Sequence, residues 1–212
     1  MGILGRLRVL LQSVFGKGHV RIGIYGPPNA GKTTLANRIS RDWSGDIVGS
    51  VSEIPHETRR AQKKDNVVIK NGNSSLTIDI IDTPGIATKV DFHNFMECGM
   101  NEEDSRIRAK EATEGVIEAI RWLDNIDGVI LLMDSTENPF TQVNVTIIGN
   151  LEARELPVLI AANKIDMDGS TPATIKSAFP QHDVVPISAL TGYNIEMLYE
   201  VMVKLFGKAK RK

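Results

Sequence analysis

The stretch GPPNAGKTT (residues 26–34) decides the fold class of this chain. Gly26, Gly31, Lys32 and Thr33 match the spacing G-x-x-x-x-G-K-[ST], between an apolar β-type run and a helical pattern. Glycines let backbone N–H groups surround an anion without a Cβ in the way, and the following helix N-terminus adds a favourable dipole. The stretch therefore predicts a loop that binds the phosphates of a nucleoside triphosphate.

The side chains of this phosphate loop indicate what it would hold. Lys32 is expected to reach the β- and γ-phosphates, and the Thr33 hydroxyl is expected to bind Mg²⁺. An ordinary glycine-rich turn is the alternative interpretation of the pattern. The loop positions expected to contact the nucleotide are Gly26, Asn29, Ala30, Gly31, Lys32, Thr33 and Thr34.

Short β-rich runs alternate with helical patterns along the chain, which predicts an α/β fold with a largely parallel sheet. Strands are expected at residues 19–25, 66–70, 76–82, 128–134, 157–163 and 183–188, and helices at residues 31–40, 102–123, 142–154, 172–178 and 194–206. The sequence NGNS between the second and third strands predicts a hairpin, so these strands should pair antiparallel.

The longest expected helix carries its own signals. Ala112, Val116, Ile120 and Leu123 fall on one face, which predicts the buried side. Asn101 is expected to cap the helix N-terminus.

Composition limits the range of functions. The 212 residues are enough for one domain with a well-buried core. The 25 Lys and Arg nearly balance the 26 Asp and Glu, which argues against a protein that mainly coats nucleic acid. Cys98 is the only cysteine, so no disulfide can form within the chain, as suits the cytoplasm. No apolar run approaches the roughly 18–20 residues that span a bilayer.

The sequence NKID (residues 163–166) follows an expected strand and indicates which base is bound. A carboxylate can accept two hydrogen bonds from N1–H and N2–H₂ of guanine, whereas adenine has no such pair of donors. Asp166 is expected to accept these bonds, with the Asn163 amide at the other edge of the base. The stem of Lys164 should pack on the ring.

Two further motifs lie at expected strand ends. In DTPG (residues 82–85), the Asp82 carboxylate is expected to hold Mg²⁺ through water, and the Gly85 N–H to sense a γ-phosphate. DTPG is also an ordinary Pro-Gly turn. In SAL the Ala189 N–H can be offered to guanine O6. The third expected base-binding segment consists of Ser188, Ala189 and Leu190.

Taken in order, GPPNAGKT, DTPG, NKID and SAL resemble the motifs of a small GTPase of the TRAFAC class. The P-N-A-G-K form of the loop is most similar to the Era/EngA/MnmE-like branch. The resemblance covers residues 20–206. It implies a P-loop NTPase fold, a three-layer sandwich around a six-stranded, mostly parallel sheet with one antiparallel strand. It also implies a Mg²⁺-dependent switch that hydrolyses GTP to GDP and phosphate.

The resemblance also implies a switch threonine. HETRR (residues 56–60) is similar to the T-T-R of this branch, so Thr58 is the expected Mg²⁺-sensing hydroxyl. Glu57 stands where the branch usually has a second Thr. The implied catalytic residues are Lys32, Thr58, Gly85 and Asn29, and the implied metal-binding residues are Thr33, Thr58 and Asp82.

A departure from Ras-like enzymes bears on the rate. Those enzymes carry a Gln directly after D-x-x-G to orient the attacking water, and Ile86 stands there in this chain. An alkyl group cannot polarise water, so slow intrinsic hydrolysis is expected. Some members of the branch use the phosphate-loop Asn, here Asn29, to hold K⁺ in place of an arginine finger. The alternative for Asn29 is an ordinary loop residue that satisfies its own backbone.

The segment after DTPG, residues 86–105, mixes charges with Phe92, Phe95 and Met96. Nucleotide-dependent partner contact and packing against the following helix both remain open for these side chains.

The expected organisation has three parts. Residues 1–18 form an amphipathic basic helix, residues 19–207 a GTPase domain and residues 208–212 a basic tail. The helix could lie on an anionic membrane, dock on a partner or pack on its own core. Era has a C-terminal KH domain for RNA, and no KH-type RNA-binding module is expected here.

Two functions of different kind remain. The first is a GTP-hydrolysing switch. The second is a slow-turnover assembly factor on ribosomal RNA or a membrane, with an unknown effector protein or a ribosomal ribonucleoprotein as partner. An ATP-using P-loop kinase is disfavoured by Asn163 and Asp166.

Overall fold

The computed structural model describes residues 19–44, 62–71, 74–83, 85–86, 92–97 and 99–206. The predicted N-terminal helix of residues 1–18, the basic tail of residues 208–212 and Thr58 lie outside these ranges.

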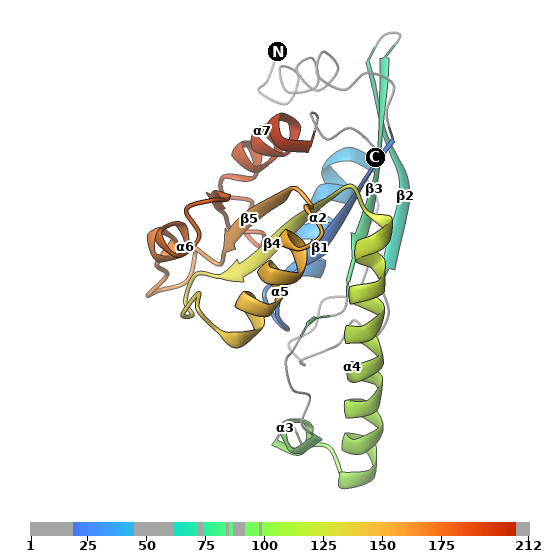
Figure 1. Ribbon diagram of the computed structural model, residues 1–212, viewed down its shortest axis with the longest axis vertical. Helices are drawn as coiled ribbons and strands as arrows, with labels where there is room; N and C mark the ends of the chain where they lie inside the picture. The colour runs from blue at the N-terminus through green and yellow to red at the C-terminus, as the bar shows by residue number, and fades with distance from the viewer. Residues whose placement is uncertain are drawn as a thin grey trace.

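Figure 1 shows a central sheet with helices on both sides. The strands are β1 His19–Tyr25, β2 Gln62–Asn71, β3 Ser74–Asp82, β4 Gly128–Asp134, β5 Val158–Asn163 and β6 Asp183–Pro186. The helices are α2 Lys32–Ser44, α3 Phe92–Glu97, α4 Glu102–Trp122, α5 Gln142–Glu152, α6 Pro172–Ala178 and α7 Ile195–Phe206, with a 3₁₀ turn at Leu123–Asn125.

The sheet order is β2-β3-β1-β4-β5-β6. Five strands from β3 to β6 run parallel, and β2 pairs antiparallel with β3 at the edge, closing at the pair Asn71 and Ser74. β1 lies between β3 and β4, with Ile22 opposite both Ile80 and Gly128. The strand order therefore reverses at β1, which is where open α/β sheets place a ligand.

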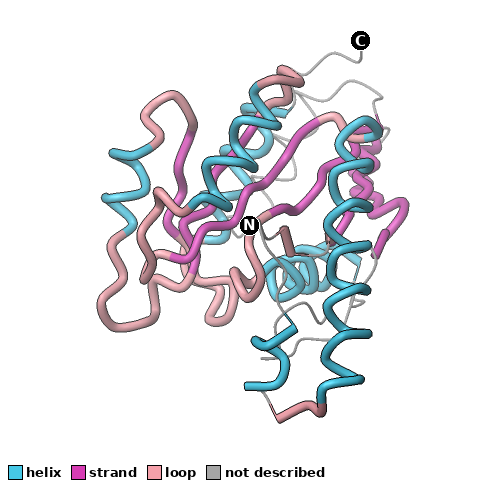
Figure 2. Tube along the Cα trace, turned by 60° about the horizontal axis from the view of Figure 1, so that its bottom comes forward, coloured by secondary structure: helices cyan, strands magenta, loops and turns pink. Residues whose placement is uncertain are grey.

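The core has two halves because parallel strands are buried on both faces. On one face, Ile130 and Leu132 of β4 pack with α2 and α7. On the other, Leu131 and Met133 pack with α4, α5 and α6. Every residue of β4 and β5 is buried. Figure 2 shows helices lying across the strands, as the alternation of β-rich runs and helical patterns in the sequence predicts. None of the helices in the described ranges is both long and apolar enough to cross a membrane.

Helix α4 begins as predicted, and its buried side extends beyond the predicted apolar face. The Asn101 side chain accepts a hydrogen bond from the Asp104 N–H at 2.8 Å, so the predicted cap is confirmed. The buried line is Ser105, Arg108, Ala112, Gly115 and Ala119. Of the predicted face, Ala112 and Leu123 are buried, and Val116 and Ile120 are partly buried. The prediction was incomplete, because a hydrophobic pattern overlooks the small and polar residues that also face the core.

The sequence missed α3, a helix of six residues inside the segment after DTPG. Phe95 is buried and α3 contacts α4, so packing rather than partner contact accounts for this aromatic side chain. Met96 remains exposed. Such a short helix shows too little periodicity to be recognised from sequence.

A pair of glycines tests the packing of the two core layers. A Cβ added to Gly128 at the start of β4 would lie 2.5 Å from a ring carbon of Phe206 at the end of α7. We expect Gly128→Ala to lower the free energy of unfolding by about 1–3 kcal/mol through overpacking. Gly149 on α5 has nothing within 4 Å of an added Cβ. Gly149→Ala should raise stability by roughly 0.5–1 kcal/mol, since alanine favours helix. Urea denaturation measures both, and equal effects would contradict the packing described for Gly128.

Candidate functional site

The phosphate loop joins β1 to α2 at the point where the strand order reverses. Gly31 has φ of 93°, a conformation that other residues rarely adopt, and an added Cβ would collide with the Asn163 amide nitrogen. The loop can therefore approach the end of β5 only with glycine at this position. Asn29 at the loop tip is exposed, with φ of 59°.

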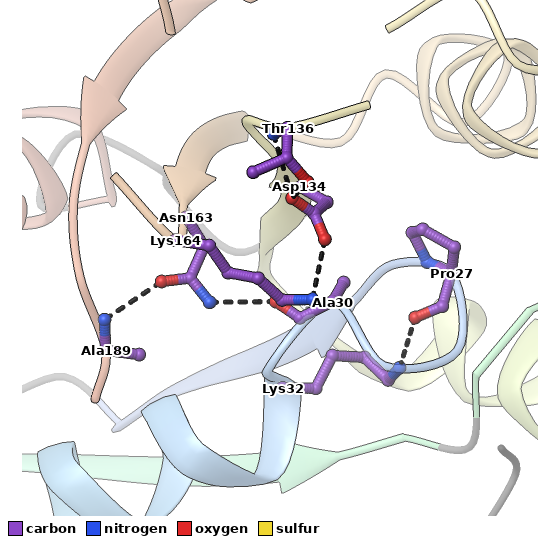
Figure 3. A network of polar contacts seen from close by, with 8 residues as sticks. All are labelled: Pro27, Ala30, Lys32, Asp134, Thr136, Asn163, Lys164 and Ala189. Atoms are coloured by element: carbon purple, nitrogen blue, oxygen red, sulfur yellow. Dashed lines mark hydrogen bonds and ion pairs between the residues drawn. The ribbon is translucent and has the colours of Figure 1, made fainter. Parts of the chain in front are cut away.

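Lys32 lies inside the loop that it follows. Its side chain is buried, and Nζ donates to the Pro27 carbonyl at 2.8 Å (Figure 3). Burial lowers the pKa of Lys32 to about 8, and the Asp82 carboxylate opposes part of this effect. Because burial outweighs the effect of the Asp82 charge, this ammonium would gain from an added anion.

Thr33 and Asp82 meet beneath the loop. The Thr33 Oγ1 donates to the Asp82 Oδ2 at 2.7 Å, which joins α2 to the end of β3. Asp82 is fully buried, and among the described residues its Oδ1 has no hydrogen-bond partner. Burial raises the pKa of Asp82, although the Thr33 hydrogen bond and the Lys32 charge act in the opposite direction.

This donor set fits Mg²⁺, which takes hard oxygen ligands and keeps part of its water shell. Thr33 supplies a hydroxyl, and Asp82 supplies a carboxylate oxygen that has no hydrogen-bond partner in the described part of the chain. Groups of three or more His, Cys, Asp or Glu side chains do not occur in the described residues, so the fit rests on this pair.

The DTPG turn is held against the phosphate loop. Thr83 donates to the Ile24 carbonyl at 2.7 Å, and a Cβ on Gly85 would lie 2.8 Å from the Cα of Pro28. The Ile86 N–H donates to the Gly26 carbonyl at 3.1 Å, and its side chain is buried in the core with Tyr25. The residue where Ras-like enzymes orient water therefore has its side chain in the core.

The buried amide of Asn163 connects the phosphate loop to SAL. Its Nδ2 donates to the Ala30 carbonyl at 2.8 Å, and its Oδ1 accepts from the Ala189 N–H at 2.9 Å (Figure 3). The sequence analysis expected the Ala189 N–H to be available for guanine O6. In the structure this N–H donates to Asn163 instead. The second N–H of the Asn163 amide has no acceptor among the described residues.

An ion pair missed by the sequence analysis holds Lys164. Its Nζ lies 2.6 Å from Asp134 Oδ2, and Thr136 donates to the other carboxylate oxygen through its N–H and hydroxyl. Burial alone would raise the pKa of Asp134, but the hydrogen bonds from Lys164 and Thr136 hold it below its usual value. One sequence signal pointed to this ion pair: Asp134 ends a predicted strand, and NKID follows the next predicted strand along the chain.

The remaining predicted base-site residues lie along the same edge of the sheet. Asp166 is exposed in the loop after β5. Ser188 is buried and accepts the Thr191 N–H at 3.0 Å on its hydroxyl oxygen, and Leu190 is exposed. Thr34 is half-buried in the first turn of α2.

Comparison with known proteins agrees with this arrangement. The 50S ribosome-binding GTPase family matches residues 21–164. The chain is 30% identical over 187 residues to GTPase Era of Geotalea daltonii, covering 85% of this chain and 53% of that protein. It is 29% identical over 199 residues to GTPase Der of Syntrophobacter fumaroxidans, covering 89% and 39%. It therefore spans about half the length of the Era relative and less of the Der relative.

A solved structure supports the same conclusion. Era in complex with MgGDPNP and nucleotides 1506–1542 of 16S ribosomal RNA is similar with a TM-score of 0.68 at 25% identity, covering 90% of this chain and 57% of that one. The strand order, the phosphate loop at β1 and the Thr33–Asp82 contact are those of a P-loop GTPase fold. The chain belongs to the 50S ribosome-binding GTPase family, which matches more than half of its length. The predicted resemblance to the Era-like branch is confirmed.

The Lys164–Asp134 pair can be tested by its pH dependence. Because the pKa of folded Asp134 is held low, its stabilisation is present above the unfolded value of about 3.9 and is lost as pH falls through the folded value. Asp134→Asn should cost about 1–2 kcal/mol at pH 7, and less near pH 3. Urea denaturation at both pH values measures this.

The matched control for Asp134→Asn is Glu102→Gln, which removes the exposed Glu102–Arg106 pair at 2.8 Å. It should change stability by less than about 0.5 kcal/mol. A pH-independent loss in Asp134→Asn would contradict the ion-pair explanation.

Proposed function

We propose that this chain binds GTP with Mg²⁺ and hydrolyses it to GDP and phosphate as a molecular switch. The observation that carries the proposal is the Thr33–Asp82 contact beneath a loop that contains the buried Lys32. These three groups lie where family membership predicts a triphosphate, and a bound nucleotide would compensate the burial of the lysine. The proposal also draws on the GTPase relatives named above.

In this proposal Lys32 binds the β- and γ-phosphates, and Thr33 and Asp82 hold the metal. When bound, Mg²⁺ would neutralise negative charge on the phosphates while the γ-phosphoryl group transfers from GTP to water. The Gly85 N–H senses the γ-phosphate, and Thr58 is the matching group of the other switch segment. Hydrolysis then releases both segments.

The base is assigned to guanine. Asp166 accepts from N1–H and N2–H₂, and the exposed carboxylate at the sheet edge supports this role. The Lys164 stem, oriented by Asp134, packs on the ring. Asn163 contributes its remaining N–H at the other edge of the base. Ser188, Ala189 and Leu190 form the third segment of the base site.

Turnover is proposed to be slow without an activator. The buried Ile86 side chain cannot orient water, and the exposed Asn29 is proposed to hold K⁺ beside the phosphates. The Era structure bound to 16S ribosomal RNA supports a ribosomal ribonucleoprotein as partner. The alternative remains a slow-turnover assembly factor that works on ribosomal RNA or, through residues 1–18, on a membrane.

The guanine assignment is tested by changing the base acceptor. Asp166→Asn should weaken GTP binding and favour xanthosine triphosphate, because an amide can donate to the C2 oxygen of xanthine. Equilibrium binding of GTP, ATP and xanthosine triphosphate measures this preference. Asp168→Asn, two residues away and also exposed, should leave the preference unchanged. Equal competition by ATP and GTP in the unmodified protein would exclude the assignment.

The cation proposal concerns hydrolysis alone. We expect single-turnover GTP hydrolysis with Mg²⁺ to be faster in potassium than in sodium, and Asn29→Ala to remove the difference. Lys32→Met, which removes the phosphate-binding charge, should abolish nucleotide binding in either salt. Equal rates in potassium and sodium at several concentrations would rule out the cation role and leave GTP binding intact.

A further inference from the structure

Arg38 of α2 donates hydrogen bonds to the backbone of the loop that follows β6. We call this loop, residues 188–193, the base loop. Its Nε donates to the Ala189 carbonyl at 2.7 Å, and its Nη2 donates to the Leu190 carbonyl at 2.6 Å. Two successive carbonyls are thus held by one planar guanidinium, whose rigid fork suits such a pair. α2 is also the helix whose N-terminus forms the phosphate loop.

Peptide geometry determines where the matching N–H groups point. In a trans peptide the C=O of one residue and the N–H of the next point in opposite directions, and the described residues contain no cis bond. Holding the Ala189 carbonyl toward α2 therefore turns the Leu190 N–H away from α2. The Thr191 N–H obeys the same rule, and it donates to the Ser188 hydroxyl at 3.0 Å.

The Leu190 N–H is the donor that the base loop does not use itself. Its other amides donate within the protein: Ser188 to Tyr193, Ala189 to Asn163, Thr191 and Gly192 to Ser188, and Tyr193 to Thr191. Within the described part of the chain, the Leu190 N–H has no acceptor. It follows directly in sequence the amide that Asn163 holds.

We propose that Arg38 is a specificity-determining positioning residue that presents the Leu190 N–H to guanine O6. This rests on the guanine nucleotide binding proposed above. Guanine has an acceptor oxygen at this position, whereas adenine has an amino donor that an N–H group would oppose. Arg38 acts through the loop backbone, without touching the base.

Neighbouring contacts also hold the base loop in one position against α2. Gly192 has φ of 88°, and an added Cβ would lie 2.7 Å from Arg38 Nη1, so the guanidinium fills space that a side chain would need. One turn along α2, Asp42 accepts a hydrogen bond from the buried Tyr199 of α7 at 2.7 Å.

Three diphosphates separate the contribution of O6 from general weakening. GDP and inosine diphosphate both carry O6, whereas the 2-aminopurine riboside diphosphate lacks O6 and N1–H. Inosine diphosphate lacks only the N2 amino group. Dissociation constants are measured for the full chain, for Arg38→Ala and for Arg38→Lys, with thermal melting as the check of folding. Arg106→Ala, which removes an exposed arginine on α4, is the matched control.

Arg38→Ala should weaken GDP and inosine diphosphate by the same factor, roughly 2- to 10-fold, and the 2-aminopurine diphosphate by less than about 2-fold. Arg38→Lys should fall between, since one ammonium lacks the planar fork, and Arg106→Ala should change nothing. Equal weakening of all three diphosphates would show general support of the fold and overturn the proposal.

An unchanged dissociation constant for GDP in Arg38→Ala would also overturn the proposal. Equal binding of GDP and the 2-aminopurine diphosphate by the unmodified protein would overturn it as well. In that case the proposal that the chain binds guanine nucleotides would still stand. An unmodified protein that binds no GDP would instead refute the proposed function.

Discussion

The buried amide of Asn163 is the interaction on which the geometry of the site depends. Through Ala30 and Ala189 it fixes the distance between the loop assigned to phosphates and the loop assigned to the base. Loops at the ends of parallel strands have few other constraints, because no ladder continues beyond the sheet. A single side chain with a donor and an acceptor on one planar group holds both. Loss of either bond would leave a buried polar atom unsatisfied, which is costly.

The sequence predicted the α/β class and the loops that make up the site, because strand runs and glycine spacing are local signals. It could not predict Asp134, whose partner Lys164 is reached only when β4 and β5 pair with Asp134 opposite Asn163. Likewise, nothing in the sequence singled out Arg38, because its partners Ala189 and Leu190 lie more than 150 residues away along the chain. For the same reason the sequence could not show that the Ala189 N–H, which it offered to guanine O6, donates to Asn163. Thr58 stays a prediction.

The same site is costly for the fold. Lys32 and Asp82 are both buried. Burial lowers the pKa of Lys32 and raises the pKa of Asp82, so it favours the neutral form of each side chain. Neither shift stabilises the free protein at neutral pH, so these groups oppose folding while the hydrophobic layers above and below the sheet favour it. Such unfavourable burial is common where a protein keeps charges ready for a ligand. The surrounding strands, buried along their whole length, offset the cost.

The pKa of Lys32 would also link the proposed nucleotide binding to proton uptake. Burial lowers this pKa from its usual value to about 8, so the neutral amine becomes accessible at mildly alkaline pH. A polyanion beside the amine favours the ammonium and raises its pKa, so nucleotide binding as proposed above would draw a proton from solution in this range. The heat of binding would then include the ionisation heat of the buffer. The affinity proposed for nucleotide should therefore fall as pH rises above 8, and Lys32 is the only titratable side chain in residues 26–34.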